Sequence, residues 1–192
     1  LNNVISFDTE NGIFEAEAGL SIGDILKIII PKGWFIPVSA GTKFVTLGGA
    51  VANDIHGKNH HKFGTFGRHV ESMTLQRSNG DILELSNSSN EDLFKATIGG
   101  LGLTGLIRTV KIKLIKETCY FDFENIQFSN LDEFFELTEE SEEKYDYTVS
   151  WVDCASSGKN LGRGIFMRAN HSKEAPKKTH SDDTKLTIPF NF

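Results

Sequence analysis

The sequence predicts an α+β fold built in two parts. Two pairs of short, alternating segments are each joined at an Asn-Gly step, at positions 11–12 and 79–80, which is typical of antiparallel hairpins. Helical patterns lie between these hairpins without the regular strand-helix repeat of a parallel sheet. The texture changes near residue 117, so we expect one domain over 1–116 and a second over 117–192.

The elements of the first part follow from periodicity and from start and stop signals. The pattern predicts strands over 4–8 and 13–19, a helix over 21–30 that begins at a capping serine and stops at a proline, a short strand over 34–38, a helix that begins near Thr46, two strands within 70–86, a capped helix over 90–100 that ends at glycine, and a strand from Ile107. Glycines lie where these elements meet, as expected of tight connections.

The second part has a different pattern. It predicts strands over 119–128, 147–153 and 162–171, and an acidic amphipathic helix over 130–144. The acidic run indicates a solvated helix face. These elements again describe an α+β unit.

Composition excludes several classes of protein. The net charge of −6 and a pI near 5.5 do not favour nucleic acid as a partner. Two cysteines, Cys119 and Cys154, are too few for a disulfide scaffold. The longest apolar run, 25–30, is too short to span a membrane.

The stretch 46-TLGGAVANDIHGKNHH-61 raises the question of a metal or a nucleophile. His56, His60 and His61 include an H-x3-H spacing, but Gly57 and Asn59 disfavour the helix that would align two imidazoles, and no glutamate follows His56. We therefore expect no metal. No G-x-S-x-G motif is present to suggest a hydrolase.

The glycines of the same region indicate an anion. Small residues recur over 40–57, and a second glycine cluster, 99-GGLGLTG-105, follows about fifty residues later. Backbone without Cβ atoms lets N–H groups approach an anion, and a helix beginning near Thr46 would add the positive end of its dipole. Two such clusters suggest a long anionic cofactor lying across the domain.

These motifs carry a family resemblance. P-x-x-x-G-T at 37–42, the stretch 46–61, F-G-x-H-V at 66–70 and L-F-x-A-T-x-G-G-x-G-L-T-G at 93–105 resemble the FAD-binding domain of the vanillyl-alcohol oxidase/p-cresol methylhydroxylase superfamily. More narrowly, they resemble its decaprenylphosphoryl-β-D-ribose 2′-oxidase branch. The similarity is dense from Trp34 to Ile107 and resumes at 147–153 and 161–164.

The resemblance implies site residues and a cofactor, FAD bound non-covalently. By matching position, the residues implied to bind FAD are Gly41, Thr42, Thr46, Leu47, Gly48, Gly49, His56, Gly57, Asn59 and Ile107. Of these, Gly41 and Thr46–Gly49 would hold the pyrophosphate through backbone amides, the segment from His56 would lie beside the flavin ring, and Ile107 would contact the adenine end. His56 and Lys58 are the implied catalytic residues, and Lys58 and Trp151 are implied to bind substrate.

The resemblance also implies a reaction. A sugar 2′-hydroxyl of a phosphorylated or polyprenyl-linked sugar would be oxidised by hydride transfer to flavin N5, with an NAD-dependent ketoreductase as a partner, in the cytoplasm and in peripheral contact with the membrane through the substrate. The family's Arg/Gly-rich pyrophosphate loop would precede Leu1, and its C-terminal lysine would follow Phe192, so we expect a fragment that is inactive alone. Two alternatives stay open: another sugar or alcohol oxidase of this superfamily, and a flavin-free binding module.

Overall fold

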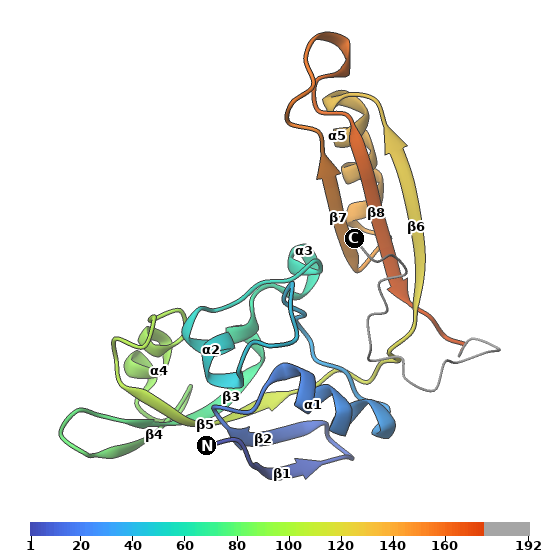
Figure 1. Ribbon diagram of the computed structural model, residues 1–192. Coiled ribbons are helices and arrows are strands. Elements are labelled where there is room, and N and C mark those ends of the chain that lie inside the picture. The colour runs from blue at the N-terminus through green and yellow to red at the C-terminus, as the bar shows by residue number, and fades with distance from the viewer. Residues whose placement is uncertain (175–192) are drawn as a thin grey trace, which may run out of the picture.

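The computed structural model describes residues 1–174. Two antiparallel sheets organise this part of the chain, and Figure 1 shows the second standing away from the first. The five-stranded sheet has the order β1-β2-β5-β3-β4, and the three-stranded sheet has the order β6-β8-β7. Helices and antiparallel strands are mixed in both parts, which confirms the expected α+β class.

The first sheet forms from two hairpins and a central strand. Hairpin strands β1 (Val4–Asp8) and β2 (Ile13–Glu17) pair, as do β3 (Val70–Gln76) and β4 (Ile82–Ser86), and β5 (Leu106–Lys113) lies between β2 and β3. Gly12 and Gly80 adopt positive φ in the two connections, which explains the Asn-Gly signals.

Three α-helices lie on one side of this sheet in Figure 1: α1 (Ile22–Ile29), α2 (Leu47–Ala52) and α4 (Glu91–Thr97). Ser21 caps α1 by accepting a hydrogen bond from the Asp24 N–H, and a 3₁₀ turn, η1 (Ile30–Lys32), ends it at the predicted proline. The core between helices and sheet is apolar and includes Phe14, Ile25, Leu47 and Ile112, all fully buried.

Two local predictions are wrong. Residues 34–38 form no strand; Phe35 makes a single bridge to Ile115, because the segment crosses the core as a buried connection. Asn90 precedes α4 but does not cap it with its side chain, which instead donates to the Glu84 carbonyl while the Asn90 backbone adopts a left-handed conformation.

The second sheet is covered on one face. Strands β6 (Phe121–Phe128), β7 (Tyr147–Val152) and β8 (Gly164–His171) pair as β6-β8-β7, and α5 (Leu131–Glu142) packs its Phe134 against Phe128 and Phe166. Arg168, on the same face, pairs with Glu124 and Glu140. Side chains alternate along a strand, so the opposite face carries Trp151, Ile165 and Met167.

Short helices connect α2 to β3 and form the edge nearest the second sheet: α3 (His60–Phe63) and the 3₁₀ turn η2 (Phe66–His69). A third 3₁₀ turn, η3 (Gly158–Asn160), lies between β7 and β8. The chain passes from the first sheet to the second through residues 114–120, where we predicted the domain boundary.

His69 makes the stability of this edge depend on pH. Its Nε2–H donates to the Phe63 carbonyl at 2.9 Å. Burial lowers the pKa of His69 below its ordinary 6.5, and neighbouring Arg68 adds to this, while the hydrogen bond opposes it. The unfolded chain therefore binds the proton at higher pH than the folded protein does.

The contribution of His69 to the free energy of unfolding should be complete above pH 6.5 and be lost as pH falls. His69→Gln keeps an N–H donor but cannot titrate. Urea unfolding from pH 7.5 to 5 should show a shallower loss of stability for this variant than for the wild type. Equal slopes would show that His69 does not titrate with folding.

Candidate functional site

Helix α2 begins as the sequence predicts, but its first N–H groups are already engaged. Thr46 is the N-cap, and its Oγ1 accepts from the Gly49 N–H at 3.1 Å. The Leu47 N–H donates to Leu20 O and the Gly48 N–H donates to Ala18 O, each at 2.8 Å. The expectation that these amides are open to a pyrophosphate is therefore corrected: they anchor α2 to the chain after β2.

Close packing against Ala18 requires glycine at position 48. A Cβ at this position would lie 2.7 Å from the Ala18 Cβ, closer than real Cβ atoms approach. Leu47 is likewise fully buried in the core. Both residues place α2 against the sheet, and a ligand could meet Gly49 and Thr46, which lie nearer the surface.

Backbone N–H groups that could bind a ligand lie in the loop that precedes α2. Gly41 and Thr42 are exposed, and no described residue accepts a hydrogen bond from either N–H group. A Cβ at Gly41 would meet nothing within 4 Å, so a ligand has room beside the backbone. The Gly41–Thr42 loop thus fits the phosphate groups of an FAD molecule better than the first turn of α2 does.

The two glycine clusters predicted to share a ligand do converge. The N–H groups of Gly99 and Leu101 donate to Val51 O and Ala52 O, which closes the C-terminal end of α2. Asp54 follows in a left-handed conformation, and its Oδ1 accepts from the Gly67 N–H at 2.8 Å. Residues 99–101 therefore lie beside the segment that leads to His56.

Ile107 lies near the start of β5, which follows the second glycine cluster. Its side chain is buried in the core, and it pairs with Leu75 across the β3–β5 ladder. Only its backbone could contact a ligand, which agrees with the kind of contact predicted for it; the contact itself stays a prediction.

The segment from His56 to Asn59 is a tight loop against Pro37–Ser39. A Cβ on Gly57 would lie 2.4 Å from the Ser39 carbonyl oxygen, so only glycine allows this approach. His56 and Lys58 are exposed, and the His56 ring contacts the His60 ring edge-on at 5.7 Å between centroids. The structure therefore brings the loop of Gly41 and Thr42 and the loop of the predicted catalytic residues side by side.

Asn59 departs from its predicted role. Its side chain is completely buried, and its Nδ2 donates to the Pro37 carbonyl at 2.7 Å. Its Oδ1 has no hydrogen-bond partner among the described residues. The Asn59 side chain therefore holds the loop from beneath and does not face an external ligand.

The same loop is bound to the second sheet, which sequence reasoning missed. The Thr148 N–H donates to Lys58 O at 2.9 Å, and the His61 Nε2–H donates to Tyr145 O at 2.8 Å. Lys62 reaches Glu143 O at 2.9 Å and pairs with Asp146 at 3.1 Å. His61 therefore links α3 to the segment that leads into the second sheet. Within residues 1–174, no group of three His, Cys, Asp or Glu side chains is placed to hold a metal.

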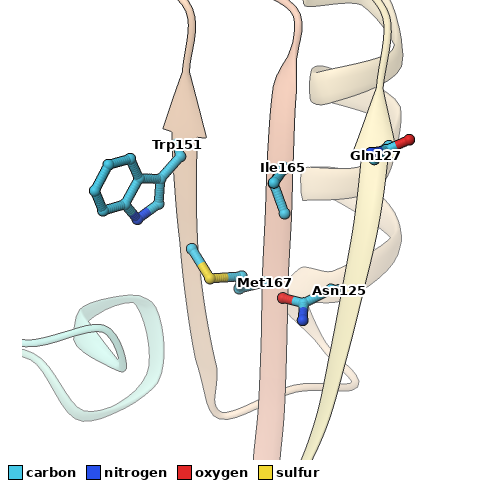
Figure 2. Close-up of a pocket in the computed structure, with 5 residues that line it drawn as sticks. All are labelled: Asn125, Gln127, Trp151, Ile165 and Met167. Atoms are coloured by element: carbon cyan, nitrogen blue, oxygen red, sulfur yellow. The ribbon is translucent and has the colours of Figure 1, made fainter. Parts of the chain in front are cut away.

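Trp151 lies on the uncovered face of the second sheet, three residues beyond Thr148 on β7. It is 74% exposed. Figure 2 shows it beside a shallow hollow of about 630 Å³ that is also lined by Asn125, Gln127, Ile165 and Met167, with α5 behind the sheet. An exposed indole at the edge of such a hollow is suited to stack on a sugar or an apolar chain.

Comparison with known proteins relates the chain to FAD-binding proteins. Residues 1–86 match the family described as an FAD binding domain. The chain is 39% identical to decaprenylphosphoryl-beta-D-ribose oxidase of Mycolicibacterium smegmatis over 194 residues, which is 98% of the chain and 42% of that protein. It is 32% identical to L-gulonolactone oxidase of Bos taurus over 117 residues, 61% of the chain and 26% of that protein.

A third relative, D-lactate dehydrogenase of Anaerostipes hadrus, is 29% identical over 120 residues, 60% of the chain and 25% of that protein. The chain thus spans less than half the length of each of these relatives. The match of residues 1–86 to an FAD binding domain supports FAD as the cofactor, and almost the whole chain is similar to a decaprenylphosphoryl-ribose oxidase.

Proposed function

We propose that this chain is part of an oxidoreductase that oxidises the 2′-hydroxyl of a phosphorylated or lipid-linked sugar. The observation that carries the proposal is the position of the exposed His56–Lys58 loop, held between the Gly41–Thr42 loop and the strand that bears Trp151. The 39% identity to a decaprenylphosphoryl-ribose oxidase, over 98% of the chain, supports this choice of substrate.

Each part of the site has a task in this proposal. The N–H groups of Gly41 and Thr42 bind cofactor phosphate, and Lys58 offers an exposed cation to the phosphate of the substrate. Trp151 and the apolar side chains of the hollow support the sugar or the start of a lipid tail. The imidazole of His56 accepts the proton that the sugar hydroxyl loses on oxidation.

FAD, when bound, supplies the hydride acceptor at its N5 atom. The chain's own residues bind, orient and polarise. We propose non-covalent binding, with His56 as a polar neighbour of the ring and not an attachment point. Residues 1–116 act in this proposal as an FAD-binding domain, and residues 117–192 as part of a substrate domain.

Partners and location follow from the proposed chemistry. A 2′-keto sugar needs a reductant if the reaction is to become an epimerisation, so an NAD-dependent ketoreductase is the proposed partner. A polyprenyl-phosphate substrate would bring a cytoplasmic enzyme into peripheral contact with the membrane surface. Within residues 1–174, no helix is both long and apolar enough to cross a bilayer.

A second candidate is an oxidase for a free sugar or a sugar lactone. The 32% identity to L-gulonolactone oxidase favours it, although that match covers 61% of the chain against 98% for the first relative. The hollow beside Trp151 favours the first candidate, because its apolar side chains, Trp151, Ile165 and Met167, suit a lipid-linked substrate better than a free sugar.

The test is product analysis with the whole, FAD-loaded protein. Polyprenyl-phosphoryl ribose and arabinose, soluble ribose phosphates and L-gulonolactone are each offered with an artificial electron acceptor, and products are read by mass spectrometry. We expect loss of two hydrogens from the polyprenyl-phosphoryl sugar, at C2′. Oxidation of the lactone alone would favour the second candidate, and a protein that ignores added FAD would exclude both.

A further inference from the structure

A line of polar side chains crosses the junction between the two sheets. The His171 Nδ1 lies 2.7 Å from the Thr118 carbonyl oxygen, and its Nε2 lies 2.9 Å from the Tyr147 hydroxyl. A carbonyl only accepts, so the proton of the neutral ring is on Nδ1 and Nε2 is an acceptor. The Tyr147 hydroxyl therefore donates to His171, and both rings have a defined orientation.

Aromatic packing holds this pair in place from both sides. The His171 ring contacts Phe35 of the first part at 5.3 Å and Phe121 of the second at 4.5 Å, between ring centroids. Phe121 also contacts Tyr147 edge-on at 5.2 Å. Phe35 and Tyr147 are buried, so the pair lies in a packed contact between the two parts.

The line reaches the Lys58–Asn59 loop through the backbone of β7. Thr148 directly follows Tyr147, and its N–H donates to Lys58 O at 2.9 Å. Burial raises the pKa of Tyr147, and the carboxylates of Asp146 and Glu117 add to this, so the hydroxyl keeps the proton that it donates to His171.

We propose that Tyr147 and His171 are positioning residues, which set the Lys58–Asn59 loop through the hydrogen bond from the Thr148 N–H to Lys58 O. They touch neither cofactor nor substrate. Tyr147 fixes the start of β7, and His171 fixes Tyr147 by accepting its hydroxyl proton. The assignment of a ligand to the loop rests on the proposed function; the positioning itself does not.

Hydrogen exchange on the cofactor-free protein tests the positioning directly. Tyr147→Phe keeps the ring and removes the hydroxyl, and His171→Phe keeps the aromatic packing and removes the acceptor. A single hydrogen bond of ordinary strength is worth roughly a fivefold change in local opening, so peptides covering 56–62 should exchange roughly five times faster in either variant. The double variant should exchange no faster than the single ones, because both break the same contact.

Tyr145→Phe is the matched control. It removes a hydroxyl two residues away, on a ring that packs against Arg168 on the α5 face, and it keeps the carbonyl that accepts from His61. Wild-type exchange at 56–62 in Tyr147→Phe, or equal acceleration in Tyr147→Phe and Tyr145→Phe, would overturn the proposal. If Tyr147→Phe does not fold, His171→Phe must still accelerate exchange at 56–62 selectively, or the proposal is wrong.

The FAD-loaded protein supplies a second readout. A misplaced loop should shift the flavin absorbance bands and lower kcat of Tyr147→Phe more than it changes KM, whereas Tyr145→Phe should do neither. A protein that does not bind FAD would refute the proposed function and leave the exchange result intact. Faster exchange with an unchanged spectrum and unchanged kcat would overturn the positioning of a functional loop.

Discussion

Gly57→Ala should cause a large loss of stability for the addition of a single methyl group. The new Cβ would lie 2.4 Å from Ser39 O and 3.1 Å from Asn59 Oδ1, and the first of these is backbone that cannot rotate away. The loops 37–42 and 56–59 must separate to admit it. We expect the free energy of unfolding to fall by about 1–3 kcal/mol, as for overpacked sites.

The same substitution should weaken FAD binding by about tenfold or more, since a loss of 1.4 kcal/mol in binding free energy already gives that factor. Flavin fluorescence quenching measures the affinity, and urea unfolding measures the stability. Gly41→Ala is the control for stability: its Cβ would meet nothing within 4 Å, and its φ is not positive, so the stability should change by less than about 0.5 kcal/mol. Equal destabilisation by both variants would contradict the close approach of the two loops.

Lys58→Met should cause the largest loss of activity without loss of fold. Lys58 is exposed, and its structural contact is made by its backbone carbonyl, which the substitution keeps. If its ammonium meets the substrate phosphate, removing this charge should lower kcat/KM by about 10²-fold, comparable to the loss of one preorganised electrostatic contact. The melting temperature should stay at the wild-type value.

His56→Ala separates binding from chemistry at the same loop. A proton-transfer role predicts a fall in kcat of about 10²-fold with little change in KM. Flavin released by denaturation from the wild-type protein would show that His56 is not a covalent attachment point.

The control for Lys58→Met is Lys95→Met. Lys95 is on the exposed surface of α4, and its substitution should leave kcat/KM unchanged. Full activity of Lys58→Met would exclude a role for that cation.

Much of the fold could be predicted because its signals are local. The Asn-Gly connections, the Ser21 cap and the proline at 31 each act over a few residues, and each is in the structure where the pattern indicates. Residues 34–38 show the limit of this reasoning. An apolar run predicts burial, and whether it also forms a strand depends on a neighbour, here only Ile115.

The candidate site, like the fold, could be predicted from the sequence only in part. By itself, the sequence determined the cofactor class and the segments that surround it, because glycine spacing and the D-I-H-G-K-N-H-H motif are properties of the chain. Only the tertiary structure decided which groups are open to a ligand. The Leu47 and Gly48 amides are used by Leu20 and Ala18, Asn59 is buried under its own loop, and His61 binds Tyr145. Each of these outcomes depends on a partner distant in sequence, and a hydrogen bond to such a partner leaves no mark in the local pattern.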